Sequence, residues 1–152
     1  MIELHFECDI KASAERAFAL LADLRDYDRW LPSSSAFKGT HRISEGPIGV
    51  GTTHVEPGPF GVRHGQVTEF APPTRLSFEQ PMSLKPKAFG VIGIQLFHTL
   101  TQGAGSVHVH RELQLEPHGI VRWMTPPIVP AFRAENERMM KALKSYAESD
   151  RP

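Results

Sequence analysis

The sequence predicts an α+β fold, in which one antiparallel sheet is combined with a long C-terminal helix and with two short helices after the first strand. Three observations carry this prediction. Residues 2–10 alternate between apolar and polar side chains, which is typical of a half-buried strand. Short runs of strand-forming residues, separated by turn residues, occupy the middle of the chain. From residue 128 onward, apolar side chains recur every three or four positions, as on one face of a helix.

Residues 10–32 predict the two short helices. Ser13 is a favourable N-cap residue, and Glu15 lies in the first turn, where the helix dipole stabilises an anion. The apolar face of this first helix consists of Ala17, Phe18, Leu20, Leu21 and Leu24. Residues 23–28 interrupt this pattern. A second short helical turn follows and ends at Pro32, and the side chains of Tyr27, Trp30 and Leu31 lie on one side of it. Neither helix can bury its apolar face on the other alone, so we expect both to pack on a larger element.

Six further segments have the composition of strands and are separated by turn signals. They are residues 37–43, 52–55, 62–70, 76–80, 87–101 and 106–116. The prolines of Ala71-Pro-Pro-Thr stiffen one connection, and Gln102-Gly-Ala-Gly closes the last and longest hairpin. Short strands joined in this way indicate one meandering antiparallel sheet. The glycines at positions 46, 49 and 51 lack the sequence context of a phosphate-binding loop, so we interpret them as turn residues.

The C-terminal helix is expected to contain Pro130 in its first turn, where the missing N–H has little effect. Its apolar face consists of Val129, Phe132, Met139, Met140, Leu143 and Tyr146. The methionines are either plain core or an adaptable wall over a cavity, because thioethers repack easily around varied shapes. Asn136 falls in the same face, and its buried amide needs partners in the sheet, in water or on a ligand.

Length and composition exclude several classes of protein. The 152 residues suffice for one domain, expected at residues 1–150. The formal net charge is zero and no basic run occurs, so nucleic acid is not an expected partner. No segment approaches the roughly 20 apolar residues of a membrane span, so no stable membrane insertion is expected, and the N-terminus does not resemble a signal peptide. The single cysteine, Cys8, excludes an internal disulfide and suits the cytoplasm, where we expect the protein.

Short motifs along nearly the whole chain carry a resemblance to a known family. They are Ile10-Lys-Ala-Ser-Ala-Glu-Arg-Ala-Phe, Leu21-Ala-Asp, Trp30-Leu-Pro, Gly51-Thr, Val67-Thr-Glu-Phe-Ala-Pro-Pro-Thr-Arg-Leu and Leu143-Lys-Ser-Tyr-Ala-Glu. In this order and spacing the sequence resembles the START-like (SRPBCC) superfamily, and within it the polyketide cyclase/dehydrase-like branch. The resemblance implies a helix-grip fold, in which a seven-stranded antiparallel sheet wraps around the long C-terminal helix and leaves a deep cavity. Relatives bind lipids, hormones, quinones or polyketides in that cavity, and some catalyse reactions there. The family has no universal catalytic residue, so none is carried over.

The last hairpin indicates which polar residues face the cavity. A two-residue turn at Gly103-Ala104 would place His98 opposite Val109, and Leu96 opposite Arg111. The apolar stripes of both strands then share the inner face, on which only His98 and Arg111 are polar, as diagonal neighbours. A turn one residue longer would reverse every facing.

A buried arginine is unfavourable unless it is paired, and none of the neighbours of Arg111 in its stripe is an acid. One interpretation is that Arg111 binds a carboxylate, phosphate or enolate oxygen of a ligand, with His98 as hydrogen-bond partner or proton carrier. The other is that Arg111 pairs with an acid from another element at the cavity mouth, and that His98 is a satisfied core histidine. His98 and Arg111 are therefore the candidate catalytic residues.

Trp30 could cover a ligand at the cavity mouth, or it could simply clamp the short helix on the sheet. The complete set of expected ligand-binding residues is Trp30, Leu96, His98, Val109, Arg111, Phe132, Met139 and Met140.

His108 and His110 are expected on the outer face of the sheet. A His-x-His pair on a strand can supply two metal ligands, and His5 or Glu7 could add a third. Outer faces of antiparallel sheets are normally just polar, so we expect no metal site and no cofactor. Residues 33–35, three serines, lack the context of a nucleophile elbow.

Three functions remain compatible with the sequence. The first is binding of a small, mostly apolar molecule, lipid-like, aromatic or polyketide-like, in an apolar cavity of several hundred cubic ångströms. The second is a polyketide cyclase or dehydratase, with His98 as acid or base and Arg111 stabilising an enolate oxygen. The third is an interaction module that presents residues 118–127 to a partner or a membrane surface. The expected partner is thus a small apolar ligand, and the expected assembly is a monomer or homodimer.

Overall fold

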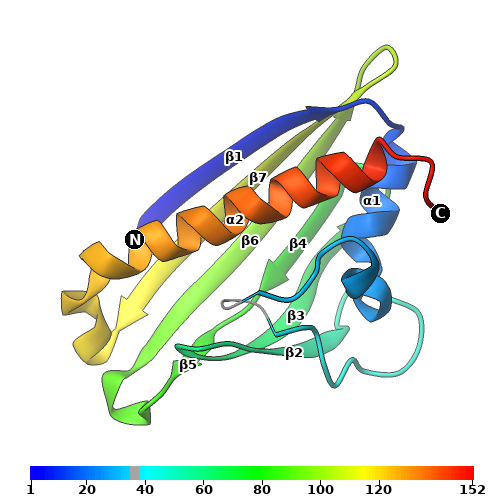
Figure 1. The fold of residues 1–152 in the computed structure, drawn as a ribbon. Helices are drawn as coiled ribbons and strands as arrows, with labels where there is room; N and C mark the ends of the chain where they lie inside the picture. Colours follow the sequence, from blue (N-terminus) through cyan, green and yellow to red (C-terminus); the bar gives the residue numbers. More distant parts are fainter. Residues whose placement is uncertain (35–37) are drawn as a thin grey trace.

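The computed structural model describes residues 1–34 and 38–152. Its main element is a seven-stranded antiparallel sheet (Figure 1). The strands are β1 (Ile2–Ile10), β2 (Thr53–Pro57), β3 (Gly61–Ala71), β4 (Arg75–Glu79), β5 (Met82–Leu84), β6 (Val91–Gln102) and β7 (Val107–His118). Their order in the sheet is β1-β7-β6-β4-β3-β2, and β5 pairs with β3 and β6 beside this path.

Helices cover one face of the sheet. The helix α1 (Ala14–Ala22) and the 3-10 helix η1 (Leu24–Arg29) follow β1, and α2 (Thr125–Ala147) ends the fold. Two short 3-10 helices, η2 (Lys87–Phe89) and η3 (Gly119–Trp123), lie before β6 and before α2. In Figure 1, α2 crosses the sheet and its C-terminal end meets α1. The expected helix-grip fold, with seven strands, two short helices after the first strand and a long C-terminal helix, is confirmed.

One hydrogen-bond chain attaches α1 to the end of α2. The Ser13 hydroxyl caps α1, as expected, by accepting a hydrogen bond from the Arg16 backbone N–H at 3.1 Å. The Arg16 side chain donates to the carbonyl oxygens of Tyr146 at 3.1 Å and Ala147 at 2.8 Å. Carbonyl groups at a helix C-terminus lack partners within the helix, so this guanidinium satisfies them while it holds the two helices together.

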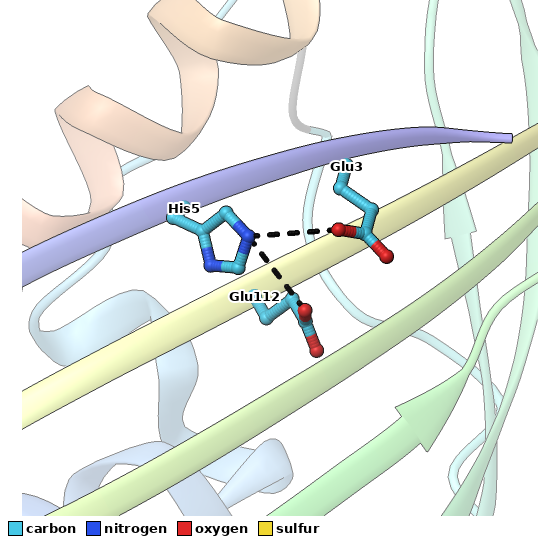
Figure 2. A group of neighbouring side chains, drawn as sticks. All are labelled: Glu3, His5 and Glu112. Atoms are coloured by element: carbon cyan, nitrogen blue, oxygen red, sulfur yellow. Dashed lines mark ion pairs between the residues drawn. The ribbon is translucent and has the colours of Figure 1, made fainter.

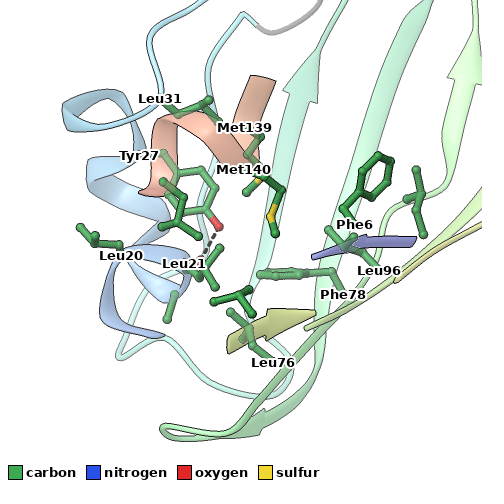
Figure 3. Packing of buried hydrophobic residues seen from close by; sticks show 14 of the residues in the cluster. Phe6, Leu20, Leu21, Tyr27, Leu31, Leu76, Phe78, Leu96, Met139 and Met140 are labelled. Atoms are coloured by element: carbon green, nitrogen blue, oxygen red, sulfur yellow. Dashed lines mark hydrogen bonds between the residues drawn. The ribbon is translucent and has the colours of Figure 1, made fainter. Parts of the chain in front are cut away.

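The hydrophobic core lies between the inner face of the sheet and the helices. Figure 3 shows its centre, where side chains from β4 and β6 meet those of α1, η1 and α2. The residues labelled there are Phe6, Leu20, Leu21, Tyr27, Leu31, Leu76, Phe78, Leu96, Met139 and Met140. Within the described residues, no helix combines the length and apolar character that crossing a membrane requires.

Two segments that were expected to form strands do not. Residues 38–43 make only an isolated bridge, from His41 to Val55, and Phe37 lies outside the described residues. Gly39 and Arg42 have φ values of 93° and 50°, which are incompatible with an extended strand. Residues 87–90 form η2 and its cap rather than the start of β6, since Gly90 has a φ of 107°. The strand β5 was not expected.

The register of the last hairpin differs from the expected one by two residues. Gln102 pairs with Val107, so the connection has four residues, and Gly103 N–H donates to the Ser106 carbonyl at 2.7 Å. The expected pairings of His98 with Val109 and of Leu96 with Arg111 are therefore wrong. His98 lies directly opposite Arg111 instead. An even shift leaves each side chain on its expected face, which is why the inner face is still assigned correctly.

Helix boundaries also differ from expectation. The helix α2 begins at Thr125, so Pro126 and Pro127 occupy its first turn, and Pro130 lies inside the helix rather than in its first turn. The second short helix, η1, starts at Leu24, directly after α1. A 3-10 helix does not follow the 3.6-residue period, so the interrupted apolar pattern of residues 23–28 did not reveal it.

Candidate functional site

A cavity lies between the inner face of the sheet, η1 and the middle of α2. Its polar lining residues are Tyr27, Glu56, Arg63, Gln80, Arg111, Glu135 and Asn136. Its apolar lining residues, most of them labelled in Figure 3, are Leu24, Leu31, Phe78, Leu96 and Met139. We call this space the inner cavity; it encloses about 50 Å³.

Arg111 supplies a buried positive charge to the inner cavity. Only 7% of the residue is exposed. Its Nε donates to Asn136 Oδ1 at 2.7 Å, and its Nη1 donates to His98 Nε2 at 2.7 Å. Within residues 1–34 and 38–152, no carboxylate lies within 4.0 Å of the guanidinium, and Nη2 has no acceptor. Burial lowers the pKa of Arg111 to about 10, so the guanidinium remains protonated at neutral pH.

His98 holds Arg111 from the adjacent strand. Its Nδ1 donates to the Leu76 carbonyl at 3.1 Å, because a carbonyl can only accept. The proton is thus on Nδ1, and Nε2 accepts from Arg111. Burial, and next the charge of Arg111, lower the pKa of His98 well below its usual value, which keeps the ring neutral. With both ring nitrogens engaged, His98 positions Arg111 and has no free nitrogen for proton exchange with a ligand.

Glu56 is the buried acid of the inner cavity. It pairs with Arg63, whose Nη2 lies 2.9 Å from Glu56 Oε2, and His54 Nε2 lies 3.4 Å from the other oxygen. Burial, the largest single influence, would by itself raise the pKa of Glu56, but Arg63, His54 and the charge of Arg111 together hold that pKa below its usual value. Glu56 is therefore ionised, and Arg63 balances its charge.

Tyr27 and Glu135 complete the polar wall. The Tyr27 hydroxyl donates to the Leu21 carbonyl, and burial raises the pKa of this phenol, so it stays neutral (Figure 3). The Glu135 carboxylate pairs with Arg138 at 2.6 Å on the same helix. Each of the two acids that line the inner cavity therefore forms an ion pair with another arginine. Neither of them contacts Arg111 directly.

Two further hollows adjoin the inner cavity toward the N-terminal end of α2. The first, called the passage here, encloses about 50 Å³ and shares Arg63, Glu135 and Asn136 with the inner cavity. The second, called the mouth, encloses about 240 Å³. The passage and the mouth share Pro59, Phe60, Met82, Ile128 and Phe132. The three hollows therefore follow one another along α2, from a charged inner end to an apolar outer end.

The largest difference from expectation concerns the shape of this space. The sequence predicts one apolar cavity of several hundred cubic ångströms, whereas the structure has a small polar inner cavity and a larger apolar mouth. The side chains of Tyr27, Phe78 and Met139 fill the region where the helices approach the sheet (Figure 3). Bulky side chains from three elements meet there, and their combined volume could not be read from any one segment.

The expected ligand-binding residues divide into two groups. Leu96, Arg111 and Met139 line the inner cavity, and Phe132 lines the passage and the mouth. The others are buried side chains that are not among these lining residues, namely Trp30, His98, Val109 and Met140. The Trp30 indole N–H donates to the Leu20 carbonyl at 3.1 Å and its ring packs edge-on against Tyr27, so Trp30 joins η1 to α1.

Several lining residues were not expected from the sequence, above all Glu56, Arg63 and Gln80. The strand β2 has only five residues, and His54 and Glu56 alternate with partly exposed neighbours. This alternation is the one feature of the sequence that could have placed His54 and Glu56 on the same face of the sheet. It does not say which face, because a polar outer face has the same pattern. The assignment needs the partner strand, because β2 pairs with β3 only in the folded sheet.

On the outer face, His108 and His5 lie beside acids, whereas His110 contacts His5 at 3.0 Å. His108 contacts Asp9 at 2.9 Å and Glu7 at 3.3 Å, and these hydrogen bonds raise the pKa of His108. Nearby, His5 Nε2 lies 3.9 Å from Glu3 and 3.7 Å from Glu112 (Figure 2). This trio is close enough to surround a cation. Glu3 and His5 are exposed and Glu112 is half-buried, and exposed acidic groups commonly gather in this way without a bound ion.

Comparison with known proteins identifies relatives. A family model for polyketide cyclase / dehydrase and lipid transport matches residues 1–148. No curated protein sequence matches the chain significantly.

Among solved structures, protein CV1439 from Chromobacterium violaceum is 15% identical, with a TM-score of 0.72 over 97% of this chain and 98% of its own. Norcoclaurine synthase from Thalictrum flavum, solved in complex with dopamine and hydroxybenzaldehyde, is 16% identical, with a TM-score of 0.72 over 99% of this chain and 88% of its own. The Aha1 dimer from Colwellia psychrerythraea is 17% identical, with a TM-score of 0.61 over 95% of this chain and 97% of its own. At these identities the similarity shows the fold alone.

Proposed function

The chain belongs to the polyketide cyclase / dehydrase and lipid transport family, and from this premise we propose that it binds a small, mostly apolar molecule between the sheet and α2. The observation that supports the proposal is the succession of hollows along α2, apolar at the mouth and charged at the inner end. Ligand sites of this kind are typically apolar with a few placed polar groups. We propose that residues 1–150 act as one ligand-binding domain, as a monomer or homodimer in the cytoplasm.

The mouth suits the apolar body of the ligand. Its walls come from β5, η2, η3 and the start of α2, and Met82, Ile128 and Phe132 contribute apolar surface. Met82 and Phe132 also line the passage, so a ligand that enters between them meets Asn136 and Arg63 next. Lipid-like, aromatic and polyketide-like molecules all satisfy this description.

A matched pair of substitutions on α2 tests the proposal. Ala131 lines the passage, whereas Ala134 is exposed on the same helix. We expect Ala131→Phe to weaken binding of the neutral fluorescent probe 1-aminoanthracene at least tenfold, and Ala134→Phe to leave it unchanged. Native mass spectrometry of the purified protein, followed by denaturing extraction, would identify a molecule retained from the cell. Equal probe affinity in both variants would contradict the proposed location of the site.

An enzymatic role in the same space is the alternative that the charged inner end favours. A polyketide cyclase or dehydratase would use Arg111 to stabilise an enolate oxygen. His98 would have to release Arg111 before acting as an acid or base, because both of its ring nitrogens are bonded. Turnover of a model polyketide that survives His98→Gln would exclude His98 as the proton carrier.

A membrane-facing role of the mouth is favoured by its exposed rim. Ile120 is 55% exposed and Trp123 is 77% exposed, and Arg122 stacks over the Trp123 ring. Apolar residues with a neighbouring cation suit the surface of an anionic bilayer. A blue shift of tryptophan emission on adding anionic liposomes, absent in Trp123→Phe, would support this role. Unchanged emission in the unmodified protein would count against it.

A further inference from the structure

We propose that the ligand carries a single anionic head group, a carboxylate, that binds Arg111 in the inner cavity while its apolar body extends through the passage to the mouth. This inference rests on the proposed function and names the class of its ligand.

Both acids that line the inner cavity are bonded to an arginine other than Arg111. Glu56 is paired with Arg63 at 2.9 Å, and Glu135 is paired with Arg138 at 2.6 Å. Arg111 has no carboxylate within 4.0 Å in the described part of the chain. The charges of Glu56 and Glu135 act on Arg111 only from beyond this distance. A buried guanidinium gains most from a directly bonded carboxylate, and one bound monoanion would provide that partner.

Arg111 still offers N–H donors to a ligand. A guanidinium has five N–H donors. Asn136 and His98 occupy Nε and one proton of Nη1, and Nη2 has no acceptor among residues 1–34 and 38–152. Both partners accept rather than donate, so they orient the guanidinium without neutralising it. A carboxylate that accepts from Nη2 would form a charge-assisted hydrogen bond, which is stronger than a neutral one.

The inner cavity and the mouth differ in size and in polarity. The inner cavity encloses about 50 Å³, whereas the mouth encloses about 240 Å³ and is lined almost entirely by apolar side chains. The inner cavity is several times smaller than the mouth and is lined by charged and polar groups, so it suits the head group, and the mouth suits the larger apolar body. A molecule with one anionic head group and an apolar body fits these two spaces when its head group lies in the inner cavity and its body lies in the mouth.

The test compares molecules that differ only in the head group. Decanoate and decanol form an aliphatic pair, and 2-naphthoate and 2-naphthalenemethanol form an aromatic pair. Displacement of 1-aminoanthracene is measured at pH 7.5, where both carboxylates are ionised. In the unmodified protein we expect the carboxylate of at least one pair to bind ten times more tightly than its alcohol, in 0.5 M NaCl as in 0.05 M. The pair that shows the preference tells whether the body is aliphatic or aromatic. Surface attraction would vanish at high salt, whereas a buried contact is screened far less.

Two variants isolate Arg111. In Arg111→Met the preference for the carboxylate should disappear while the alcohol still binds, which also shows that the variant is folded. Asn136→Asp places a carboxylate of the same shape beside Arg111. In the pair that shows the preference, we expect it to reduce the affinity of the carboxylate at least tenfold and to spare the alcohol. Arg133→Met, which removes an exposed arginine of α2, serves as the control and should keep the preference.

The outcomes separate this inference from the proposed function. Equal affinities for carboxylate and alcohol in the unmodified protein would overturn the anionic head group and leave apolar ligand binding intact. A preference that survives Arg111→Met would assign the anion to another residue and would also overturn the inference. Failure of all four molecules and of the probe to bind would overturn the proposed function itself.

Discussion

Arg111 and His98 occupy directly paired positions of β7 and β6, and the Arg111 guanidinium donates to the unprotonated Nε2 of His98 at 2.7 Å. The proton on Nδ1 of His98 is committed to the Leu76 carbonyl at 3.1 Å. These two hydrogen bonds run from the Leu76 carbonyl through the neutral His98 ring to Arg111, and they orient its guanidinium. Of the guanidinium groups that line the inner cavity, this is the one that has no carboxylate within 4.0 Å among the described residues. Four predictions follow from this region and its surroundings.

The first prediction concerns the coupling of the pair. His98→Leu should lower the free energy of unfolding by about 1–3 kcal/mol, because it leaves a buried donor of Arg111 without its acceptor. Arg111→Met should cost less in the His98→Leu background than in the unmodified protein, and a double-mutant cycle by urea unfolding should give a coupling of about 0.5–3 kcal/mol. Additive single effects would contradict a direct interaction between the two side chains.

The second prediction concerns pH. The pKa of His98 is lowered well below its usual value, so below about pH 6.5 the unfolded chain binds a proton that the folded chain does not. The free energy of unfolding should therefore fall as the pH drops from 7 to 5.5, by about 1 kcal/mol from this group. In His98→Gln this part of the pH dependence should be missing. His108 has a raised pKa and changes stability in the opposite direction, so the comparison with the variant, and not the unmodified curve alone, is decisive.

The third prediction concerns the buried acid. Glu56 has a lowered pKa, so the stability it contributes is present above the pKa of the unfolded chain, about 4.3, and is lost as the pH falls through the lower folded value. Glu56→Gln should lower the free energy of unfolding at pH 7 by about 1.5–3 kcal/mol, and the difference should shrink toward pH 3. The control is Glu69→Gln, which breaks an exposed pair with Arg75 and should cost at most about 1 kcal/mol. Equal effects of the two substitutions would contradict the role given to Glu56.

The fourth prediction concerns the close approach of β3 to His54. A Cβ on Gly65 would lie 2.2 Å from the His54 ring. That ring lies between β3 and the Glu56 carboxylate, which is 3.4 Å from its Nε2. Gly65→Ala should therefore destabilise the protein by about 1–3 kcal/mol in urea unfolding. Gly49→Ala is the matched control, because nothing lies within 4 Å of its added Cβ, and it should have little effect. Tolerance of alanine at position 65 would show that the His54 ring moves freely.

Local patterns in the sequence predict much of this fold. The alternation in residues 2–10 corresponds to β1, and Ser13 caps α1. The inner face of β6 and β7 was assigned correctly although their register was not, because the side-chain period of two is unaffected by an even shift. Segments that adopt φ values above zero, such as residues 39–42, escaped prediction because conformation there depends on the loop as a whole.

The sequence by itself therefore determined β1, the helices α1 and α2, and the inward facing of Arg111 and His98, because periodicity and capping act over a few neighbouring residues. It did not determine β5, or that residues 38–43 form no strand. Only the tertiary structure decided that Arg111 meets His98 and Asn136, that Glu56 meets Arg63, and that the space beside them is small and polar. These contacts join β7 to β6 and α2, and β2 to β3. Whether such side chains touch depends on register, on helix placement and on the volume that bulky neighbours fill, which no short segment encodes alone.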